Sequence, residues 1–396
     1  MTEFKKETMS IIVKVICFGI IGIIILHVLT KILIPKWITP EDNRMSYIVG
    51  GFYEEPKNSL DVIFMGNSDV YRGISPITMW DEYGITSYNY STSGQRMWTE
   101  YYLLEECIKT QTPRLIVLNM DSAFNETQSS ESNYRKTFDN MKLSINKIRA
   151  ITDPVFKNKK EEILSYIFPI ARFHSRWAEL EDVDFEKAFE SKKFAYKGMD
   201  ISVDTKAYVK DNEYMKKDDS KEKIGEKCYF YLNKIIATCK KNNIELLLIE
   251  LPSAESWSYD LSEKTQEFAN NKGLDFIDLN LNYKDFGFDW NTDSADGGDH
   301  LNVYGADVFF NPDYTEVDRV LDVRIVPKDE SIDVQVENNP DIEALLSETE
   351  YGEHGSYVKE FRIKWRGLPY KDLSWEIFDD FQDSASIVNY YNHLYE

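Results

Sequence analysis

The feature that most constrains the fold is a repeated alternation of short apolar runs with amphipathic stretches between residues 57 and 306. Each apolar run is rich in Ile, Leu and Val and turns polar just after its end, which is typical of a buried strand. The four runs cover 60–66, 114–120, 244–252 and 274–279. Helical patterns lie between them, at 97–110 and 227–243. This alternation predicts an α/β fold, in which helices cover both faces of a parallel sheet.

The alternation is interrupted at 122–226, where the sequence is polar, charged and helix-rich. This stretch is interpreted as an insertion or lid. After residue 310 the alternation stops, and 314–326 and 356–367 show the period-two pattern of strands. The acidic stretch 327–355 between them predicts a solvated loop, and the spacing of apolar residues over 387–394 predicts a closing helix.

Residues 10–35 form an apolar run long enough to cross a bilayer, which takes about 20 residues. The run is apolar all the way round, which disfavours a buried core helix. Lys5, Lys6 and Lys14 precede or enter it, so the positive-inside rule places residues 1–9 in the cytoplasm. No small-x-small cleavage site follows. We therefore expect an uncleaved signal anchor and a body outside the cell.

Charge and cysteine content exclude some functions. The net charge of −22 repels phosphate backbones, which argues against nucleic-acid binding but leaves basic partners open. The four cysteines show no CxxC spacing, so buried thiols are expected rather than disulfides or a metal site. No metal motif and no glycine-rich phosphate loop is visible, so no cofactor is predicted.

Ser68 is the candidate nucleophile, because it follows a predicted strand directly, behind Gly66. The carboxyl ends of parallel strands are where α/β ligand sites form. A serine hydroxyl needs a base to take its proton, and of the five histidines His300 lies in a glycine- and acid-rich loop. His174 is the other histidine outside the apolar run and the C-terminal region. The alternative role for Ser68 is a helix N-cap.

The blocks "GNSD" at 66–69, "STSGQRMW" at 91–98 and "DHLNVYGA" at 299–306 resemble those of the SGNH hydrolase superfamily over roughly 40–306. The nearest resemblance is to membrane-anchored surface proteins akin to the D-alanyl transfer protein of teichoic-acid modification and to alginate O-acetylation proteins. The resemblance implies a flavodoxin-like three-layer domain over 40–310. It also implies that Ser68 is the nucleophile, Gly94 an oxyanion donor and His300 the general base.

Two positions depart from that family. It usually has an aspartate three residues before the histidine, where this chain has Gly297. Asp296 is therefore predicted to orient His300, with Asp293 and Asp299 as alternatives. The family's third block often supplies an asparagine to the oxyanion hole, and Asp121 stands there instead.

The motif "FHSRW" at 173–177 resembles one in the same bacterial group. His174 and Arg176 are predicted to contact substrate. The alternative is a structural motif that pins the insertion to the core, with Trp177 packed inward.

The resemblance implies acyl transfer through an acyl-serine, without a metal. The reaction would be hydrolysis of an O-ester, or transfer of an acetyl or D-alanyl group, on an envelope glycan or teichoic acid. The alternative for this half is a non-catalytic glycan-binding protein.

The segment "KWRGLPYKDLSWE" at 364–376 and the strands around it resemble a chromodomain of the chromodomain-helicase-DNA-binding remodellers, over 311–396. The resemblance implies a three-stranded antiparallel sheet closed by a C-terminal helix, with Trp375 in its core. The segment is most similar to the second chromodomain of a tandem pair, which often packs on its neighbour. The alternative is binding of a histone H3 tail in a nucleus, through a methyl-lysine site. The site residues would be Thr315, Trp365 and Leu368, with Tyr314 and Tyr370 nearby.

An envelope enzyme and a nuclear module share no compartment, and the break at 309–311 has no Gly/Ser/Pro-rich linker. We therefore interpret the chain as an artificial or accidental fusion in which the last helix of the hydrolase, begun by "GADV" at 305–308, is cut short. Loss of its apolar face predicts a weakened hydrolase fold and a misplaced His300. In the alternative interpretation only the chromodomain functions.

Overall fold

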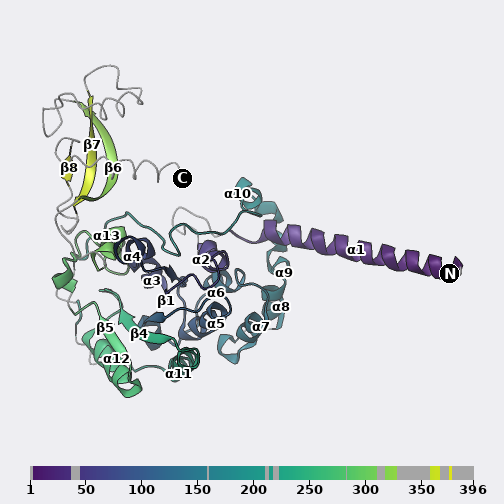
Figure 1. Ribbon diagram of the computed structural model, residues 1–396, viewed down its shortest axis with the longest axis horizontal. Helices are drawn as coiled ribbons and strands as arrows, with labels where there is room; N and C mark the ends of the chain where they lie inside the picture. The colour runs from purple at the N-terminus through teal and green to yellow at the C-terminus, as the bar shows by residue number, and fades with distance from the viewer. Residues whose placement is uncertain are drawn as a thin grey trace.

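The computed structural model describes residues 3–36, 45–157, 160–209, 214–216, 223–281, 283–309, 317–327, 357–365 and 374–376. These residues form an α/β body, a long N-terminal helix that projects from it, and a three-stranded sheet formed by the C-terminal part of the chain (Figure 1).

Five parallel strands form the sheet of the body, in the order β2-β1-β3-β4-β5. They are β1 (Val62–Met65), β2 (Ser87–Asn89), β3 (Leu115–Asn119), β4 (Glu245–Glu250) and β5 (Asp275–Asp278). Four of them match the predicted runs, and the predicted α/β fold is confirmed. The order is that of flavodoxin-like sheets, in which ligands bind outside the carboxyl ends where the strand order reverses. In this chain the reversal lies between β1 and β3.

Side chains of β1 alternate between two apolar cores because successive residues of a strand face opposite ways. Val62 and Phe64 face one side, and Ile63 and Met65 face the other. Helices on the first side are α3 (Ser68–Gly73), α4 (Pro76–Tyr83) and α13 (Val303–Val308). Helices on the second side are α2 (Met45–Phe52), α5 (Met97–Cys107), α11 (Glu226–Lys241) and α12 (Tyr259–Lys272). The body therefore has three layers.

The predicted insertion at 122–226 is helical, and its described residues include no strand. It starts in the short helix η1 (Asp121–Phe124). Its other helices are α6 (Glu131–Phe138), α7 (Ile145–Thr152), η2 (Pro154–Phe156), α8 (Lys160–Ile167), α9 (Ile170–Phe173), η3 (His174–Glu179) and α10 (Asp182–Glu186).

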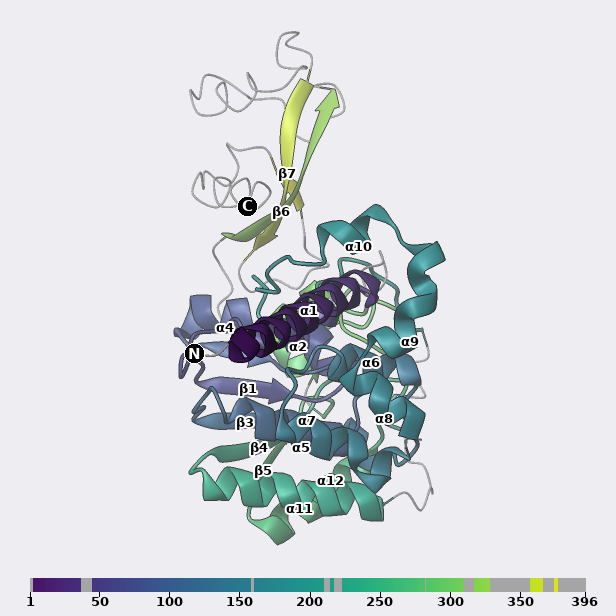
Figure 2. The ribbon, with the colours of Figure 1, turned by 90° about the vertical axis from the view of Figure 1, so that its right-hand side faces the viewer.

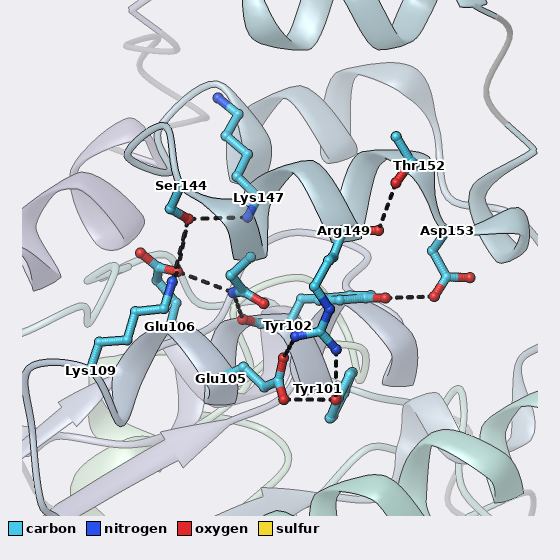
Figure 3. A network of polar contacts seen from close by, with 11 residues as sticks. Tyr101, Tyr102, Glu105, Glu106, Lys109, Ser144, Lys147, Arg149, Thr152 and Asp153 are labelled. Atoms are coloured by element: carbon cyan, nitrogen blue, oxygen red, sulfur yellow. Dashed lines mark hydrogen bonds and ion pairs between the residues drawn. The ribbon is translucent and has the colours of Figure 1, made fainter.

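A polar network fixes α7 and the residue after it onto α5 (Figure 3). The hydroxyl of Tyr102 donates to Asp153 Oδ2 at 2.6 Å, and Tyr231 of α11 donates to the same oxygen at 2.7 Å. Arg149 Nη1 lies 2.6 Å from Glu105 Oε2. The insertion is thus packed on the core helices.

Helix α1 (Glu3–Leu33) is one continuous element that leaves the body (Figures 1 and 2). Its 25 residues Met9–Leu33 are long and apolar enough to cross a membrane. The large apolar side chains from Met9 to Leu26 are exposed, whereas Leu33 is buried. A signal sequence would pass the same test.

The predicted strands at 314–326 and 356–367 are present as β6 (Val317–Pro327) and β7 (Tyr357–Trp365), which pair antiparallel. A third strand, β8 (Ser374–Glu376), pairs with β7. The helix α13 has six described residues. Pro327, the first residue of the loop predicted at 327–355, is the last residue of β6. The rest of that loop and the closing helix predicted at 387–394 lie outside the described residues.

Candidate functional site

Ser68 lies at the carboxyl end of β1, as the first residue of α3. Asn67 caps this helix, because its side chain accepts a hydrogen bond from Asp69 N at 3.0 Å. A Cβ at Gly66 would lie 2.5 Å from Val70 Cγ2 and 2.9 Å from Asn119 Cβ, so only glycine fits there. The turn therefore brings the half-buried Ser68 to the point where the strand order reverses.

Gly94 follows β2, the neighbour of β1, and has φ of +55°. A Cβ at this position would lie 2.4 Å from Asn133 Nδ2 and 2.9 Å from Ser129 Oγ, both from the insertion. The residue must be glycine for both conformational and steric reasons. Gly94 thus lies in a loop at the carboxyl edge of the sheet, packed against the insertion.

Asp121 follows β3 and meets the Ser68 turn from the other side of the reversal. Asn67 Nδ2 donates to Asp121 Oδ2 at 2.7 Å. Burial raises the pKa of Asp121, although the positive charge of Arg96 opposes this shift. Burial, together with the charge of Asp121, raises the pKa of Asp69 to about 7. The carboxyl of Asp121 is therefore engaged with Asn67, and its ionised form is disfavoured.

His300 lies in the loop before α13, and Asp296 holds it in two ways. Asp296 Oδ1 accepts from the backbone N–H of His300 at 2.9 Å, and its Oδ2 lies 2.6 Å from His300 Nδ1. Asp299 Oδ2 is 3.3 Å from the same nitrogen. Asp293 is buried elsewhere and accepts from Asp289 N and Thr292 Oγ1. Asp296 is thus the carboxylate that contacts the ring most closely.

The pKa of His300 reflects these neighbours. Burial lowers it, but the hydrogen bond to Asp296 and the charges of Asp69 and Asp299 outweigh burial, so the pKa is raised above its ordinary value. The charge of His300 in turn lowers the pKa of Asp69 and of Asp121. These mutual effects show that the His300 loop lies close to the carboxyl ends of β1 and β3.

The short α13 still anchors this loop. A Cβ on Gly73 of α3 would lie 3.2 Å from Leu301 Cδ1, so the backbone of α3 packs closely on Leu301. Thr78 of α4 donates to Asp307 Oδ1 at 2.7 Å. Ala254 N donates to Gly298 O at 2.8 Å. The shortened helix therefore keeps His300 beside the Ser68 block, in contrast to the misplacement expected from the sequence.

Two further buried acids at this edge were missed by sequence reasoning. Glu250, the last residue of β4, is fully buried, and burial raises its pKa well above the ordinary value, with the charges of Asp121 and Asp69 adding to the effect. Burial also raises the pKa of Glu100 on α5 to about 8. In the sequence, Glu250 could have been recognised as a buried acid because it is a charged residue within the apolar run 244–252. Strongly shifted carboxyls concentrate at functional sites.

Among the described residues, Asp296, Asp299 and His300 form one group whose ligand atoms lie within 4.8 Å of one another. Such atoms could hold a metal ion. The hydrogen bond between Asp296 and His300 equally suits an orienting carboxylate and its base, and the two aspartates are exposed.

The structure places His174 and Arg176 beside α1. Arg176 Nη1 donates to Leu33 O at 2.7 Å, and its Nη2 lies 2.9 Å from Asp184 Oδ2. The exposed His174 has Nδ1 3.0 Å from Ala171 O. Arg176 thus joins the insertion to α1, and contact of His174 and Arg176 with substrate stays a prediction. The predicted inward packing of Trp177 is wrong, since Trp177 is 72% exposed.

Of the expected methyl-lysine site, only Trp365 belongs to a described element, as the last residue of β7. Tyr314, Thr315, Leu368 and Tyr370 lie outside the described residues. Trp375 lies in β8.

No family model matches the chain, and no curated protein matches it. Solved structures match the chain, among them two from Bacteroides. A protein assigned as an acylhydrolase from Bacteroides fragilis has 15% identity and a TM-score of 0.30, over 65% of this chain and 88% of the other. A GDSL-like lipase from Bacteroides thetaiotaomicron has 14% identity and a TM-score of 0.28, over 63% of this chain and 83% of the other. Similarities this low carry no argument about function. None of the comparisons supports a chromodomain.

Proposed function

We propose that the α/β body is a serine-dependent acyl-ester hydrolase or acyltransferase of the SGNH type. One observation carries the proposal. The loop that holds His300 against Asp296 at 2.6 Å continues into Leu301, which packs on α3, the helix that begins at Ser68. This placement supports an arrangement of nucleophile, base and orienting carboxylate, which acyl transfer requires.

With His300 Nδ1 bound to Asp296, Nε2 is the nitrogen that takes the proton from Ser68 Oγ. The serine oxygen then attacks the ester carbonyl, and the backbone N–H groups of Ser68 and Gly94 stabilise the oxyanion. His300 returns the proton to the departing alcohol, which leaves an acyl-serine. Water or an acceptor hydroxyl attacks this ester and gives its proton to His300. Collapse of the second tetrahedral intermediate frees Ser68 Oγ, which takes the proton back from His300.

The proposed setting is the outer face of a cell membrane, with α1 as a retained anchor and with an acyl ester of an envelope glycan or teichoic acid as substrate. The retained anchor is supported by the contacts that Arg176 makes with the last turn of α1, because they bind that turn to the folded body. Histone-tail binding by 311–396 stays a prediction from sequence, and peptide binding to the full chain would test it.

The test uses the full chain in detergent, treated with a fluorophosphonate and measured by intact mass. We expect one adduct, which Ser68→Ala removes and which the exposed control Ser132→Ala on α6 keeps. A folded protein without an adduct, or an adduct that survives Ser68→Ala, would contradict the proposal.

A further inference from the structure

The end of α1 is enclosed by polar side chains of Lys36 and of the insertion. Lys36 Nζ donates to Lys31 O and Ile34 O, each at 2.7 Å, and Arg176 donates to Leu33 O. Cations on the last carbonyls of a helix satisfy groups that have no partner within it. Asp184 of α10, which is nearly fully buried, contacts both cations, with Lys36 at 3.7 Å. We call these three side chains, Lys36, Arg176 and Asp184, the α1 clamp.

The α1 clamp fixes which part of the body lies next to the membrane. The apolar span ends at Leu33, and its 25 residues cover about 37 Å at 1.5 Å each, enough for a hydrocarbon core of about 30 Å. Elements that contact Leu33 directly must lie at the level of the lipid headgroups. α9, η3 and α10 contact α1. Figures 1 and 2 show α8, α9 and α10 on the side of the body from which α1 leaves.

The same segment carries an unusual set of exposed apolar side chains. Five large ones within 26 residues are more than half exposed: Leu164, Phe168, Trp177, Phe185 and Phe189. Four of the five are Phe or Trp. Aromatic side chains favour the membrane interface, and short amphipathic elements bind there by burying such groups among the headgroups.

We propose that the segment 164–189 forms a membrane-contact surface, in which these five side chains insert into the outer headgroup region of the bilayer that α1 spans. The occupant is lipid, because the α1 clamp holds this surface at the exit of the span. Acidic and basic residues are interspersed along the segment, so binding depends on apolar insertion and not on anionic lipid. The inference rests on the proposed anchoring by α1 and is independent of chemistry at Ser68.

The experiment reconstitutes the full chain in phosphatidylcholine vesicles, with and without lipids brominated near the headgroup, which quench tryptophan on contact. Wild type is compared with Trp177→Phe and with the matched control Trp80→Phe. Trp80 is 55% exposed but lies on α4, which covers the other face of the sheet. The chain has eight tryptophans, so each variant reports by difference.

We expect Trp177→Phe to remove emission that bromolipid quenches, and Trp80→Phe to remove only emission that bromolipid leaves unchanged. Adding anionic lipid should leave this pattern unaltered. Trp177 emission that aqueous acrylamide quenches and bromolipid does not would overturn the proposal. Emission shielded from both quenchers would indicate a protein occupant and would overturn it as well.

A chain that carbonate releases from cell membranes would contradict the anchor and the membrane-contact surface together. Fluorophosphonate labelling of Ser68 would be unaffected by that result, so failure of the two proposals can be told apart.

Discussion

At the carboxyl end of the sheet, buried carboxyl groups lie close to one another, whereas at the junction of α1 with the insertion a buried carboxylate lies between two cations. In the first region Asp69 and Glu250 both have pKa values raised by burial and by Asp121. In the second, Asp184 contacts Arg176 and Lys36. A stable protein gains little from the first arrangement. Carboxyl groups with strongly shifted pKa values concentrate at functional sites, so we interpret the sheet edge as the candidate functional site. We interpret the junction as an attachment between α1 and the body.

The largest effect is expected from Asp296→Asn, which leaves the shape of the loop and removes the charge that orients His300. We expect kcat to fall about 10³-fold, since such a change disturbs the tautomer of the base. Asp296 also helps raise the pKa of His300, and the base must be neutral to act. The acid limb of the residual rate should therefore move to lower pH.

Asp299→Asn is the matched control, because Asp299 is also near His300 Nδ1 but at 3.3 Å. A pH–rate profile for both variants decides between the two carboxylates. If Asp299→Asn costs as much as Asp296→Asn, the assignment of the orienting residue is wrong.

The next effect concerns the pH dependence of stability. Glu100 accepts from Ser122 Oγ at 2.8 Å, and burial raises its pKa from 4.5 to about 8. The folded state therefore keeps a proton that the unfolded state loses, so stability falls as pH rises from about 4.5 to 8. Glu100→Gln should remove several kcal/mol of this decline and be more stable than wild type at pH 8.

Chemical denaturation at pH 5 and pH 8 measures the difference. Glu105→Gln, on the same helix and paired with Arg149 at the surface, should keep the wild-type decline. If the free energy of unfolding falls equally between pH 5 and pH 8 in wild type and Glu100→Gln, burial does not raise the pKa of Glu100 in the folded chain.

The smallest of the three effects tests the α1 clamp. Arg176→Met leaves the buried Asp184 with Lys36 alone, and we expect a loss of about 3 kcal/mol in the free energy of unfolding. Arg172→Met is the control, because Arg172 pairs with Glu131 where both are half-exposed, and such pairs contribute about 0.5 kcal/mol. Urea denaturation in one detergent compares them. Similar losses of unfolding free energy in the two variants would show that the α1 clamp stabilises the fold no more than an exposed ion pair does.

The sequence was sufficient for what depends on local pattern. The apolar runs became β1, β3, β4 and β5 because a buried parallel strand needs a continuous apolar sequence. The strand β2 was missed, since Ser-Tyr-Asn is buried without an apolar run. The order of blocks along the chain brought Ser68 and His300 to one edge, because parallel strands end at the same edge.

What the sequence left open depends on contacts between distant residues. Arg176 and Leu33 are 143 positions apart, and no local pattern links them. Of Asp293, Asp296 and Asp299, it is Asp296 that contacts the ring most closely, across a turn in which Gly297 and Gly298 have positive φ. The raised pKa of Asp69 likewise arises from burial beside Asp121, a residue from another strand.

The α1 clamp has a geometric consequence for a polymer substrate. A body joined to its anchor by a flexible tether would sample many distances from the bilayer. Contacts of Arg176 with Leu33 O and of Lys36 with Asp184 instead attach the body to the end of α1. If α1 is the anchor that we propose, the edge that carries Ser68 is held at a fixed distance from the lipid surface. The proposed enzyme would then acylate or deacylate a long envelope polymer only along the segment that passes at that distance.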